Sequence, residues 1–464
     1  MFKKNAGFIM EFNIEDINKL IRKIESEVDY VDIRAGKGNG TSIVMKDNKI
    51  QEINTGITIG ARIQVLKNGA WGFAYTNDLG KLEEISQTAI SISNRLKSDV
   101  ILSDEEVVED KIKTNRKIPV SSVDIEDKID LIKDTSKAAE LKNITSIGVK
   151  YSDSESETIF ANSQGTNIEM DETRVGMWLN TIASSGDLIQ IGHDSLGGAK
   201  GYEVIKDADI ESFSRKTAET ANRLLTAEAA PSGKFPIVTD NALTGVMIHE
   251  ALGHAVESDL ILQDDSILKD KLNTKIGSEL VNIYDDPTMD AFGHYEYDCE
   301  GVKTFKNHLV KDGQLVSLLS SRESAGKLSM KSSANARSSI SDQSIVRMSN
   351  TYLEPGDMSF EELIEDITEG IYLKGSRGGQ VDTGKGIFQF NASEAFMIKD
   401  GELSTPLRDV SLSGNILETL THIDGLGSDF KTTVGFCGKD GQLVPVGDGG
   451  PHTRIQDAVV GGSN

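Results

Sequence analysis

Cysteine is scarce in this sequence: Cys299 and Cys437 are the only two cysteines in 464 residues. Two cysteines that stand so far apart do not make the disulfide framework typical of small secreted proteins. Residues 1–11 include basic side chains but lack the apolar stretch of a secretory signal. We therefore expect a cytoplasmic protein, in which reducing conditions keep both thiols free.

Basic residues and long apolar runs are also in short supply. Lys and Arg number 49 against 73 Asp and Glu, which gives a net charge of −24. Nucleic-acid binding depends on basic groups that neutralise phosphates, so we expect no direct nucleic-acid partner. No apolar run reaches the ~18 residues that a membrane-spanning helix requires, so we expect no membrane partner either. The length and the 38% hydrophobic content indicate a folded chain of two or three domains.

The first half of the sequence alternates between helical and strand-like patterns. The helical patterns lie at residues 14–28, 81–96, 124–142 and 208–225. Strand-like segments lie between them, at residues 31–34, 41–45, 56–65, 72–75 and within 147–205, with turns at 47–48, 67–69 and 162–165. The order helix, antiparallel meander, helix therefore occurs twice, which either duplication or a common architectural habit would explain.

A change of composition near residue 230 divides the chain. Residues 226–236 contain alanines, prolines and a glycine and are the best candidate for a linker. We place an N-terminal α/β domain of helices and antiparallel meanders at residues 1–228. The C-terminal domain, at residues 232–464, should be β-rich because short apolar segments and turns dominate its later part. The predicted fold class is α+β.

The segment His249-Glu250-Ala251-Leu252-Gly253-His254 has the residue types of a metal site. Neutral imidazoles bind zinc well, and a carboxylate beside the first histidine can act as a general base toward water. The spacing H-E-x-x-x-H is one residue longer than that of the common H-E-x-x-H pattern. Positions i and i+5 of a regular α-helix lie about 140° apart, so both imidazoles reach one ion only if the helix widens or ends between them. The alternative is an ordinary helix histidine beside a solvent-facing glutamate.

The helix that carries this motif is predicted to run from Asn241, a possible N-cap after Asp240, to His254 or slightly beyond. Gly253 directly precedes the second histidine. It is therefore the position at which a distortion of the helix would cost least.

A catalytic zinc site normally has three protein ligands, and the motif supplies only two. The candidates for the third are the two cysteines, the five other histidines and many carboxylates. Cys437 is favoured because glycines surround it and Lys439 could stabilise its thiolate, whereas the acidic neighbours of Cys299 disfavour a thiolate there. For either cysteine, the alternative is a small buried apolar side chain.

The other histidines and the glycine clusters carry weaker signals. His294 and His452 lie near glycines in predicted loops and could touch a substrate, while His193, His308 and His422 are interpreted as structural or surface residues. The glycine clusters at residues 375–380 and 447–450 lack a Walker lysine followed by Ser or Thr, so nucleotide binding is not expected. We interpret them as loops or substrate contacts, with turn chemistry alone as the alternative.

Several motifs occur together in an order that resembles one protein family. They are H-E-A-L-G-H-A-V-E-S-D at 249–259, G-G-Q-V-D-T at 378–383, S-G-N at 413–415 and G-F-C-G-K-D-G-Q-L-V-P-V-G at 435–447. On these motifs the chain resembles the TldD/PmbA family of metalloproteases. One departure is D-C-E-G at 298–301, where the family pattern has D-D-E-G, so the role of Cys299 stays open.

The resemblance implies a ligand set and an assembly. The metal ligands would be His249, His254 and Cys437, with Glu250 as the motif glutamate. Because this set is complete, the chain resembles the active, TldD-like member and not the paralogous type that lacks the ligands. The resemblance further implies a β-rich C-terminal domain that buries the metal in a dimer enclosing a cavity. The dimer partner would be a second copy of the chain or a paralogue without the metal motif.

These observations lead to one main hypothesis and two alternatives. The main hypothesis is a peptidase with one Zn²⁺ per chain, or another divalent metal, that hydrolyses unfolded or extended peptides with Glu250 as the general base. One alternative is a non-catalytic regulatory protein of the DNA gyrase modulator type, which the family resemblance also brings. The other is a metal-dependent amidase that acts on small substrates.

Overall fold

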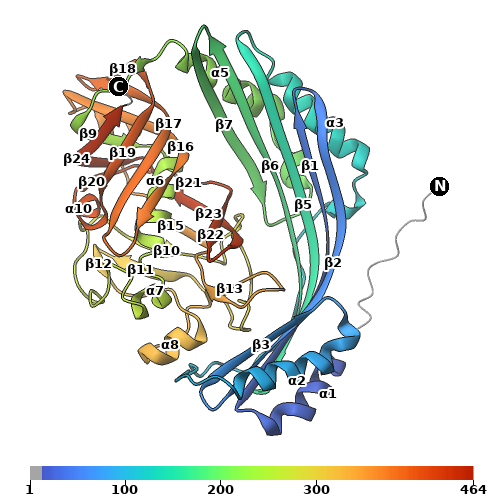
Figure 1. Cartoon of the computed structure of the whole chain (residues 1–464). Helices are drawn as coiled ribbons and strands as arrows, with labels where there is room; N and C mark the ends of the chain where they lie inside the picture. The colour runs from blue at the N-terminus through green and yellow to red at the C-terminus, as the bar shows by residue number, and fades with distance from the viewer. Residues whose placement is uncertain (1–12, 463–464) are drawn as a thin grey trace.

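The computed structural model describes residues 13–462, which form two regions that face each other (Figure 1). The sequence prediction about a secretory signal concerns residues 1–11, which lie outside the described residues. The helices of the first region are α1 (Ile14–Ile24), α2 (Leu82–Ser93), α3 (Ile125–Ala138), α4 (Glu203–Lys206) and α5 (Ile210–Leu224). Its strands are β1 (Tyr30–Lys46), β2 (Lys49–Lys67), β3 (Ala70–Thr76), β4 (Glu109–Ile112), β5 (Ile144–Asn162), β6 (Asn167–Ser185) and β7 (Leu188–Gly198).

The strands of the first region form one long, curved sheet (Figure 1). Their order is β3-β2-β1-β5-β6, and β4 and β7 pair with different parts of β6. The central pair, β1 and β5, is antiparallel. The two predicted helix–meander–helix units are thus confirmed as α1, β1 to β3, α2 and as α3, β5 to β7, α5, joined side by side in one sheet.

The first strand is longer than the sequence pattern predicts. Residues 31–34 and 41–45 belong to one strand, β1, which pairs with β2 along its whole length. Glycines at positions 36, 38 and 40 interrupt the apolar pattern without ending the strand. A Cβ atom at Gly40 would lie 2.9 Å from the backbone oxygen of Asp153 on β5, so this glycine permits close strand approach.

The second region contains most of the remaining elements. Its helices are α6 (Asn241–Ile248), α7 (Ser258–Leu262), α8 (Arg322–Leu328), α9 (Phe360–Ile364) and α10 (Ile416–Thr421). Its strands are β8 (Glu228–Ala229), β9 (Gly233–Thr239), β10 (Ile283–Asp285), β11 (Asn307–Lys311), β12 (Gln314–Leu315), β13 (Ala336–Arg337), β14 (Ile345–Val346), β15 (Asn350–Leu353), β16 (Glu369–Asp382), β17 (Ile387–Lys399), β18 (Glu402–Arg408), β19 (Val410–Asn415), β20 (Ile423–Leu426), β21 (Lys431–Thr432), β22 (Gly435–Lys439), β23 (Gln442–Gly450) and β24 (Thr453–Gly462).

Two sheets of the second region enclose the helix that carries the H-E-x-x-x-H motif. One has the order β16-β9-β24-β19-β17-β18-β8, and the other has the order β12-β11-β10-β15-β23-β21, with β22 paired to β23. Helix α6 contacts β16 of the first sheet and β15 and β23 of the second. The predicted β-rich region around a helix is therefore present, and the α+β fold class is confirmed.

The predicted linker is shorter than residues 226–236. Strand β9 begins at Gly233 and pairs with β16 and β24 in the interior of its sheet. Residues 228–229 form β8, which pairs with β18 of the same sheet. Only residues 230–232 lie between these two strands, because the apolar side chains after Gly233 contribute to the core instead of a flexible connection. None of the helices within residues 13–462 has the length and apolar character needed to cross a bilayer.

Candidate metal centre

Helix α6 begins at Asn241, as predicted, but its N-cap is the preceding residue. Asp240 is the N-cap, since its side chain accepts a hydrogen bond from the Leu243 backbone N–H at 2.9 Å. Asn241, the predicted cap, uses its amide to reach other segments, donating to Asp429 at 2.7 Å and to the Gly450 backbone oxygen at 2.8 Å. The prediction of Asn241 as N-cap was wrong because both residue types cap helices well and only the tertiary contacts separate them.

The helix widens at the motif, which is one of the two arrangements that the spacing of the histidines predicts. Helix α6 ends at Ile248, and His249–Gly253 form a π-helical turn. The His254 N–H donates to the His249 backbone oxygen at 3.2 Å, five residues back. The ring centroids of His249 and His254 lie 5.3 Å apart. The extra residue in the turn thus brings both imidazoles to one side.

Gly253 permits this turn to pack closely against the neighbouring chain. A Cβ atom at Gly253 would lie 1.9 Å from the Met348 sulfur. That distance excludes any side chain without a shift of Met348. Glycine is needed here for the packing of the turn as much as for backbone freedom.

Cys437 completes a compact group of donor atoms. It lies on β22, and its Sγ is 3.3 Å from Nε2 of His254. The donor atoms of His249, His254 and Cys437 all lie within 4.8 Å of one another. A tetrahedral zinc ion with Zn–N of about 2.0 Å and Zn–S of about 2.3 Å needs N···S separations of about 3.5 Å. The residues therefore fit a zinc ion with two nitrogen ligands and one sulfur ligand.

A carboxylate lies against the second nitrogen of each histidine. His254 Nδ1 is 3.0 Å from Oε2 of Glu257, and His249 Nδ1 is 2.7 Å from Oδ1 of Asp448. These contacts leave the Nε2 atom of each ring available to an ion. Carboxylates in this position fix the ring orientation and strengthen the imidazole as a ligand. Sequence reasoning missed both acids.

The metal-free cluster favours the thiolate form of Cys437. Burial alone would raise the pKa of this thiol, but the adjacent His249 and His254 outweigh burial and lower the pKa to about 5. Burial lowers the pKa of His254, but Glu257 and Cys437 raise it overall to about 10. An entering cation would therefore meet a thiolate and displace protons from the imidazoles.

Glu250 has a different position from the three donors. Its side chain keeps 30% of its surface exposed, and its carboxylate lies 3.9 Å from Nε2 of His254. Burial raises the pKa of this carboxyl, although both histidines act in the opposite direction. A half-buried carboxylate beside the donors, but outside their group, is suited to accept a proton.

Comparison with known proteins identifies the family. Family models match residues 31–93, 118–225 and 232–462, which correspond to domain 1, the central domain and the C-terminal domain of the PmbA/TldA metallopeptidases. The chain belongs to the PmbA/TldD family. A protein of Methanothermobacter thermautotrophicus named metalloprotease is 55% identical over 98% of this chain and 100% of its own length. One of Saccharolobus solfataricus named zinc metalloprotease TldD homologue is 30% identical over 96% of this chain and 99% of its own length.

Solved structures share the fold. TldE from Thermococcus kodakarensis aligns with a TM-score of 0.79 at 20% identity, over 96% of this chain and 99% of that chain. A Thermotoga maritima protein, provisionally described as a modulator of a DNA gyrase, aligns with a TM-score of 0.80 at 22% identity, over 97% and 100%. At these identities the likeness shows the fold and no more.

Lys439 does not act as predicted in this PmbA/TldD chain. Instead of approaching the Cys437 thiolate, its ammonium group lies 3.0 Å from Glu257 Oε2 and 2.7 Å from Asp259 Oδ2. It also donates to the Val346 backbone oxygen at 3.1 Å. The two acids after the motif turn attract the ammonium group of Lys439. The positive charge near the Cys437 sulfur comes from the two histidines.

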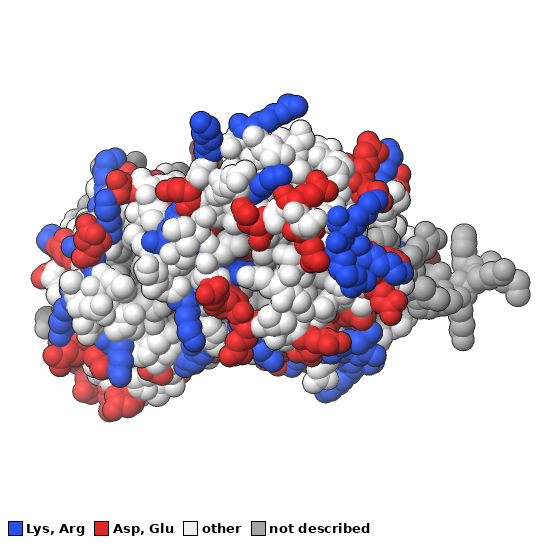
Figure 2. All heavy atoms as spheres, turned by 90° about the horizontal axis from the view of Figure 1, so that it is seen from below, with Lys and Arg blue, Asp and Glu red and all other residues white. Residues whose placement is uncertain are grey.

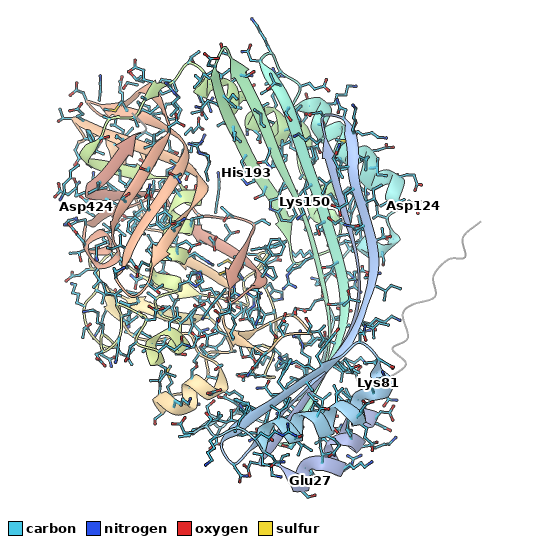
Figure 3. All side chains as sticks on the ribbon, viewed as in Figure 1. Glu27, Lys81, Asp124, Lys150, His193 and Asp424 are labelled. Carbon is cyan, nitrogen blue, oxygen red and sulfur yellow. The ribbon has the colours of Figure 1, made fainter. Side chains whose placement is uncertain are left out.

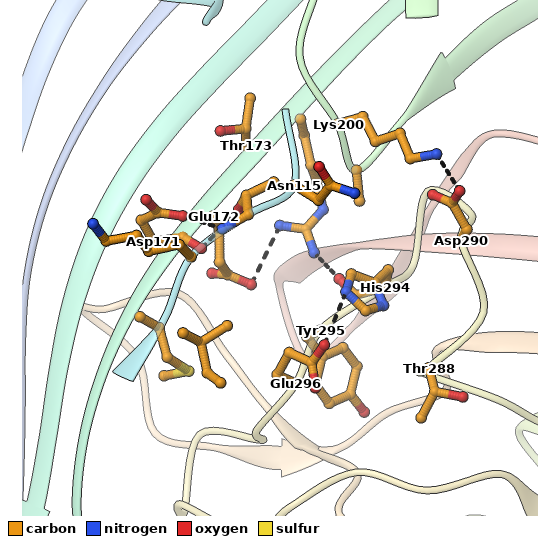
Figure 4. Close-up of a pocket in the computed structure, with 16 residues that line it drawn as sticks. Asn115, Asp171, Glu172, Thr173, Lys200, Thr288, Asp290, His294, Tyr295 and Glu296 are labelled. Carbon is orange, nitrogen blue, oxygen red and sulfur yellow. Dashed lines mark hydrogen bonds and ion pairs between the residues drawn. The ribbon is translucent and has the colours of Figure 1, made fainter. Parts of the chain in front are cut away.

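The second cysteine and the remaining histidines lie outside the donor group. Cys299 Sγ accepts a hydrogen bond from Arg34 Nη1 at 2.8 Å. His294 lines a pocket of about 260 Å³ between β6 and the loop before Glu296, drawn in Figure 4, whose lining includes none of the three donors. The others make local contacts: His193 with Asn180 on the long sheet (Figure 3), His308 with Tyr284, His452 with Asp429 and Tyr372, and His422 at the end of α10.

The two glycine clusters are strands and not loops. Residues 375–380 lie in β16, where a bulge falls between Ser376 and Gly379. Residues 447–450 lie in β23, directly against α6. A Cβ atom at Gly245 of α6 would lie 2.7 Å from the Gly449 backbone nitrogen, so the glycines let helix and strand approach closely. This approach is what brings Asp448 to His249.

Proposed function

We propose that this PmbA/TldD chain is a zinc-dependent peptidase that cleaves unfolded or extended peptides. The observation that carries the proposal is the group formed by His249, His254 and Cys437, whose donor atoms lie within 4.8 Å of one another. Two carboxylates orient the imidazoles, which is the arrangement typical of zinc sites in proteins. The names of its relatives as metalloproteases support the same chemistry.

Metal binding, orientation of the imidazoles and proton transfer are carried out by different residues of the chain. A zinc ion held by His249, His254 and Cys437 would act as a Lewis acid toward the scissile carbonyl and would acidify water. Glu257 and Asp448 hold the two imidazoles in place. Glu250 accepts the proton of the attacking water and delivers it to the leaving amine, so its carboxylate alternates between its two protonation states. The raised pKa of Glu250 suits this role, because it brings the group closer to neutral pH.

The free edge of β16 supports extended peptides as substrates. Residues 371–373 of β16 pair with β9, but beyond Lys374 the strand pairs only with β17 among the described residues. Residues 377–380 are exposed. Strand β16 also contacts the π-helical turn that carries the histidines. A peptide added to this edge would be recognised through its backbone, as in other cases of strand addition.

The test is hydrolysis by purified, zinc-loaded protein of three substrates: an unstructured peptide, a folded protein and a small amide. We expect cleavage of the unstructured peptide alone, its loss after chelation, and its return with added zinc. Cleavage of the small amide alone would make the protein an amidase. Stoichiometric zinc without hydrolysis of any of the three would favour a non-catalytic role.

A gyrase-modulating role has less support. The structural likeness that suggests it lies at 22% identity and therefore concerns the fold. Acidic and basic side chains are interspersed over the face shown in Figure 2, and the whole chain carries a net charge of −24. Such a surface favours contacts with proteins or peptides over contacts with DNA phosphates.

A further inference from the structure

A second pocket, distinct from the metal centre, lies where the two regions meet. It has a volume of about 190 Å³ and is lined by Arg34 of β1, Arg174 of β6 and Arg337 of β13. Its wall on the other side is the segment 443–445 of β23. Tyr295 and Glu172, labelled in Figure 4, line both this pocket and the neighbouring one described above. We call it the arginine pocket.

The guanidinium groups of the arginine pocket are held mainly by neutral acceptors. Arg337 donates to the Met348 and Pro445 backbone oxygens, and its guanidinium carbon lies 4.7 Å from the Tyr295 ring centroid. Arg34 donates to Cys299 Sγ and the Ser338 backbone oxygen. Neither has a carboxylate oxygen within 4.0 Å among residues 13–462.

Arg174 is fixed in the same way. It donates to the backbone oxygens of Phe292 and His294, at 3.2 and 2.5 Å. Its nearest carboxylate, Glu172, is 3.7 Å away and 29% exposed. The backbone contacts hold the guanidinium planes in fixed directions, so each group keeps unused N–H donors in a preformed arrangement.

Two carboxylates, Glu172 and Asp298, also line the pocket and offset only part of the charge of the three guanidinium groups. Asp298 accepts hydrogen bonds from three backbone N–H groups, those of Glu300, Val302 and Ala336, which occupy both of its oxygens. Burial lowers the pKa of Arg337, and the neighbouring Arg174 lowers it further, whereas Tyr295 raises it. Positive charge therefore accumulates locally in a chain whose net charge is −24.

Arg337 is buried and Arg34 and Arg174 are partly buried, and an excess of positive charge in such a pocket is costly unless an anion compensates it. We propose that the arginine pocket binds a small oxyanion, either a free phosphate-like ion or the carboxylate end of a peptide. A planar guanidinium group binds carboxylates and phosphates through two parallel hydrogen bonds, and three such groups converge on this pocket. The pocket is smaller than the ~300–1,000 Å³ of sites for drug-sized ligands, so it suits an ion or the end of a longer molecule.

Cys299 contributes to the arginine pocket because its side chain carries no carboxylate. The Cys299 sulfur accepts a hydrogen bond from Arg34 Nη1 at 2.8 Å. With an aspartate at position 299, a carboxylate would lie next to Arg34 and would compete with an external anion. With cysteine there, Arg34 faces a thiol and retains its capacity for an oxyanion.

The test is isothermal titration of the zinc-loaded full chain at constant ionic strength. The ligands are inorganic phosphate, a short peptide with a free C-terminal carboxylate and the same peptide as an amide. We expect saturable binding with about one site per chain. Binding of the free peptide and not the amide assigns a peptide carboxylate, and binding of phosphate without either peptide assigns a free ion; both support the site.

Two variants locate the binding. Arg34→Met should weaken it about tenfold or more, since a hydrogen-bonded charge is lost. Arg116→Met is the matched control, because Arg116 is already paired with Asp171 at 3.4 Å and lies outside the arginine pocket. It should leave the affinity within about twofold. If Arg34→Met does not fold, Arg34→Lys is the alternative variant. Lysine keeps the positive charge but cannot form two parallel hydrogen bonds, so it should give an intermediate loss of affinity.

The proposal is overturned by three results. One is the absence of saturable binding of all three ligands to the wild-type chain. Another is an equal loss in Arg34→Met and Arg116→Met, which indicates diffuse charge. The third is binding that Arg34→Met leaves unchanged, since such an anion sits elsewhere, for example at the metal centre. None of these results bears on peptide hydrolysis.

Discussion

Replacing Lys439 by methionine tests how the metal centre is supported. The Lys439 side chain is 10% exposed, and its ammonium group lies 3.0 Å from Glu257, whose buried carboxylate also contacts Nδ1 of His254 at 3.0 Å. Methionine keeps most of the side-chain volume but removes the positive charge that pairs with Glu257 and Asp259. Glu257 would then be free to reorient, and His254 would lose its fixed ring orientation.

The expected magnitude follows from this chain of contacts. Loss of a partner that supports a metal ligand typically weakens metal affinity about 10- to 100-fold, or about 1.4–2.7 kcal/mol. Breaking a buried ion pair also costs about 3–5 kcal/mol of folding stability, so unfolding must be measured separately. Zinc affinity is obtained by chelator competition, and stability by urea denaturation of the metal-free protein.

A matched control separates the two effects. Lys275 pairs with Glu279 at 3.1 Å on the surface, where the lysine side chain is 56% exposed. Lys275→Met should change zinc affinity by less than about twofold. If folded Lys439→Met binds zinc as tightly as the wild type, the ammonium group does not position His254 and the reasoning is refuted.

Three further predictions concern the donors and their turn. His249→Ala and His254→Ala should each abolish stoichiometric zinc, as elemental analysis would show, and full occupancy in either would remove that histidine from the site. Cys437→Ala should weaken zinc binding strongly in chelator competition while Cys299→Ala leaves it nearly intact; the reverse ranking would make Cys299 the ligand. Gly253→Ala should destabilise the fold by about 1–3 kcal/mol in urea denaturation, because its methyl group enters the space of a methionine sulfur, and an unchanged midpoint would show that the turn yields freely.

Local patterns predicted much of the fold. Helical spacing predicted α1, α2, α3 and α5, but not the short α4, which lies at the end of a stretch predicted as strands. Turn residues predicted the hairpin positions, and Asp47, Asn48 and Asn68 adopt the positive φ angles expected there. Two separate strands were predicted where the structure has the single strand β1, because Gly40 has the sequence pattern of a break between strands. Its actual reason, the close approach of β5, involves residues more than a hundred positions away.

In the metal centre, too, local features were predicted from the sequence and contacts between distant segments were not. The i, i+5 spacing of His249 and His254 predicted that the helix either widens or ends between them, because the constraint lies within six residues. Asp448 could not be predicted, since it reaches His249 only through the packing of β23 on α6. Glu257 had a weak signal, three residues after His254 and thus on the same side of a helical turn. The dimer and its partner remain predictions.

The most direct test of the central claim is the variant Glu250→Gln, measured for zinc content and for cleavage of an unstructured peptide. Glu250 is not among the three donors, so the variant should hold about one zinc per chain, as the wild type does. An amide cannot accept the proton of water, so hydrolysis should fall about 10²- to 10⁴-fold. A zinc-loaded variant that cleaves the peptide at the wild-type rate would contradict the proposed mechanism.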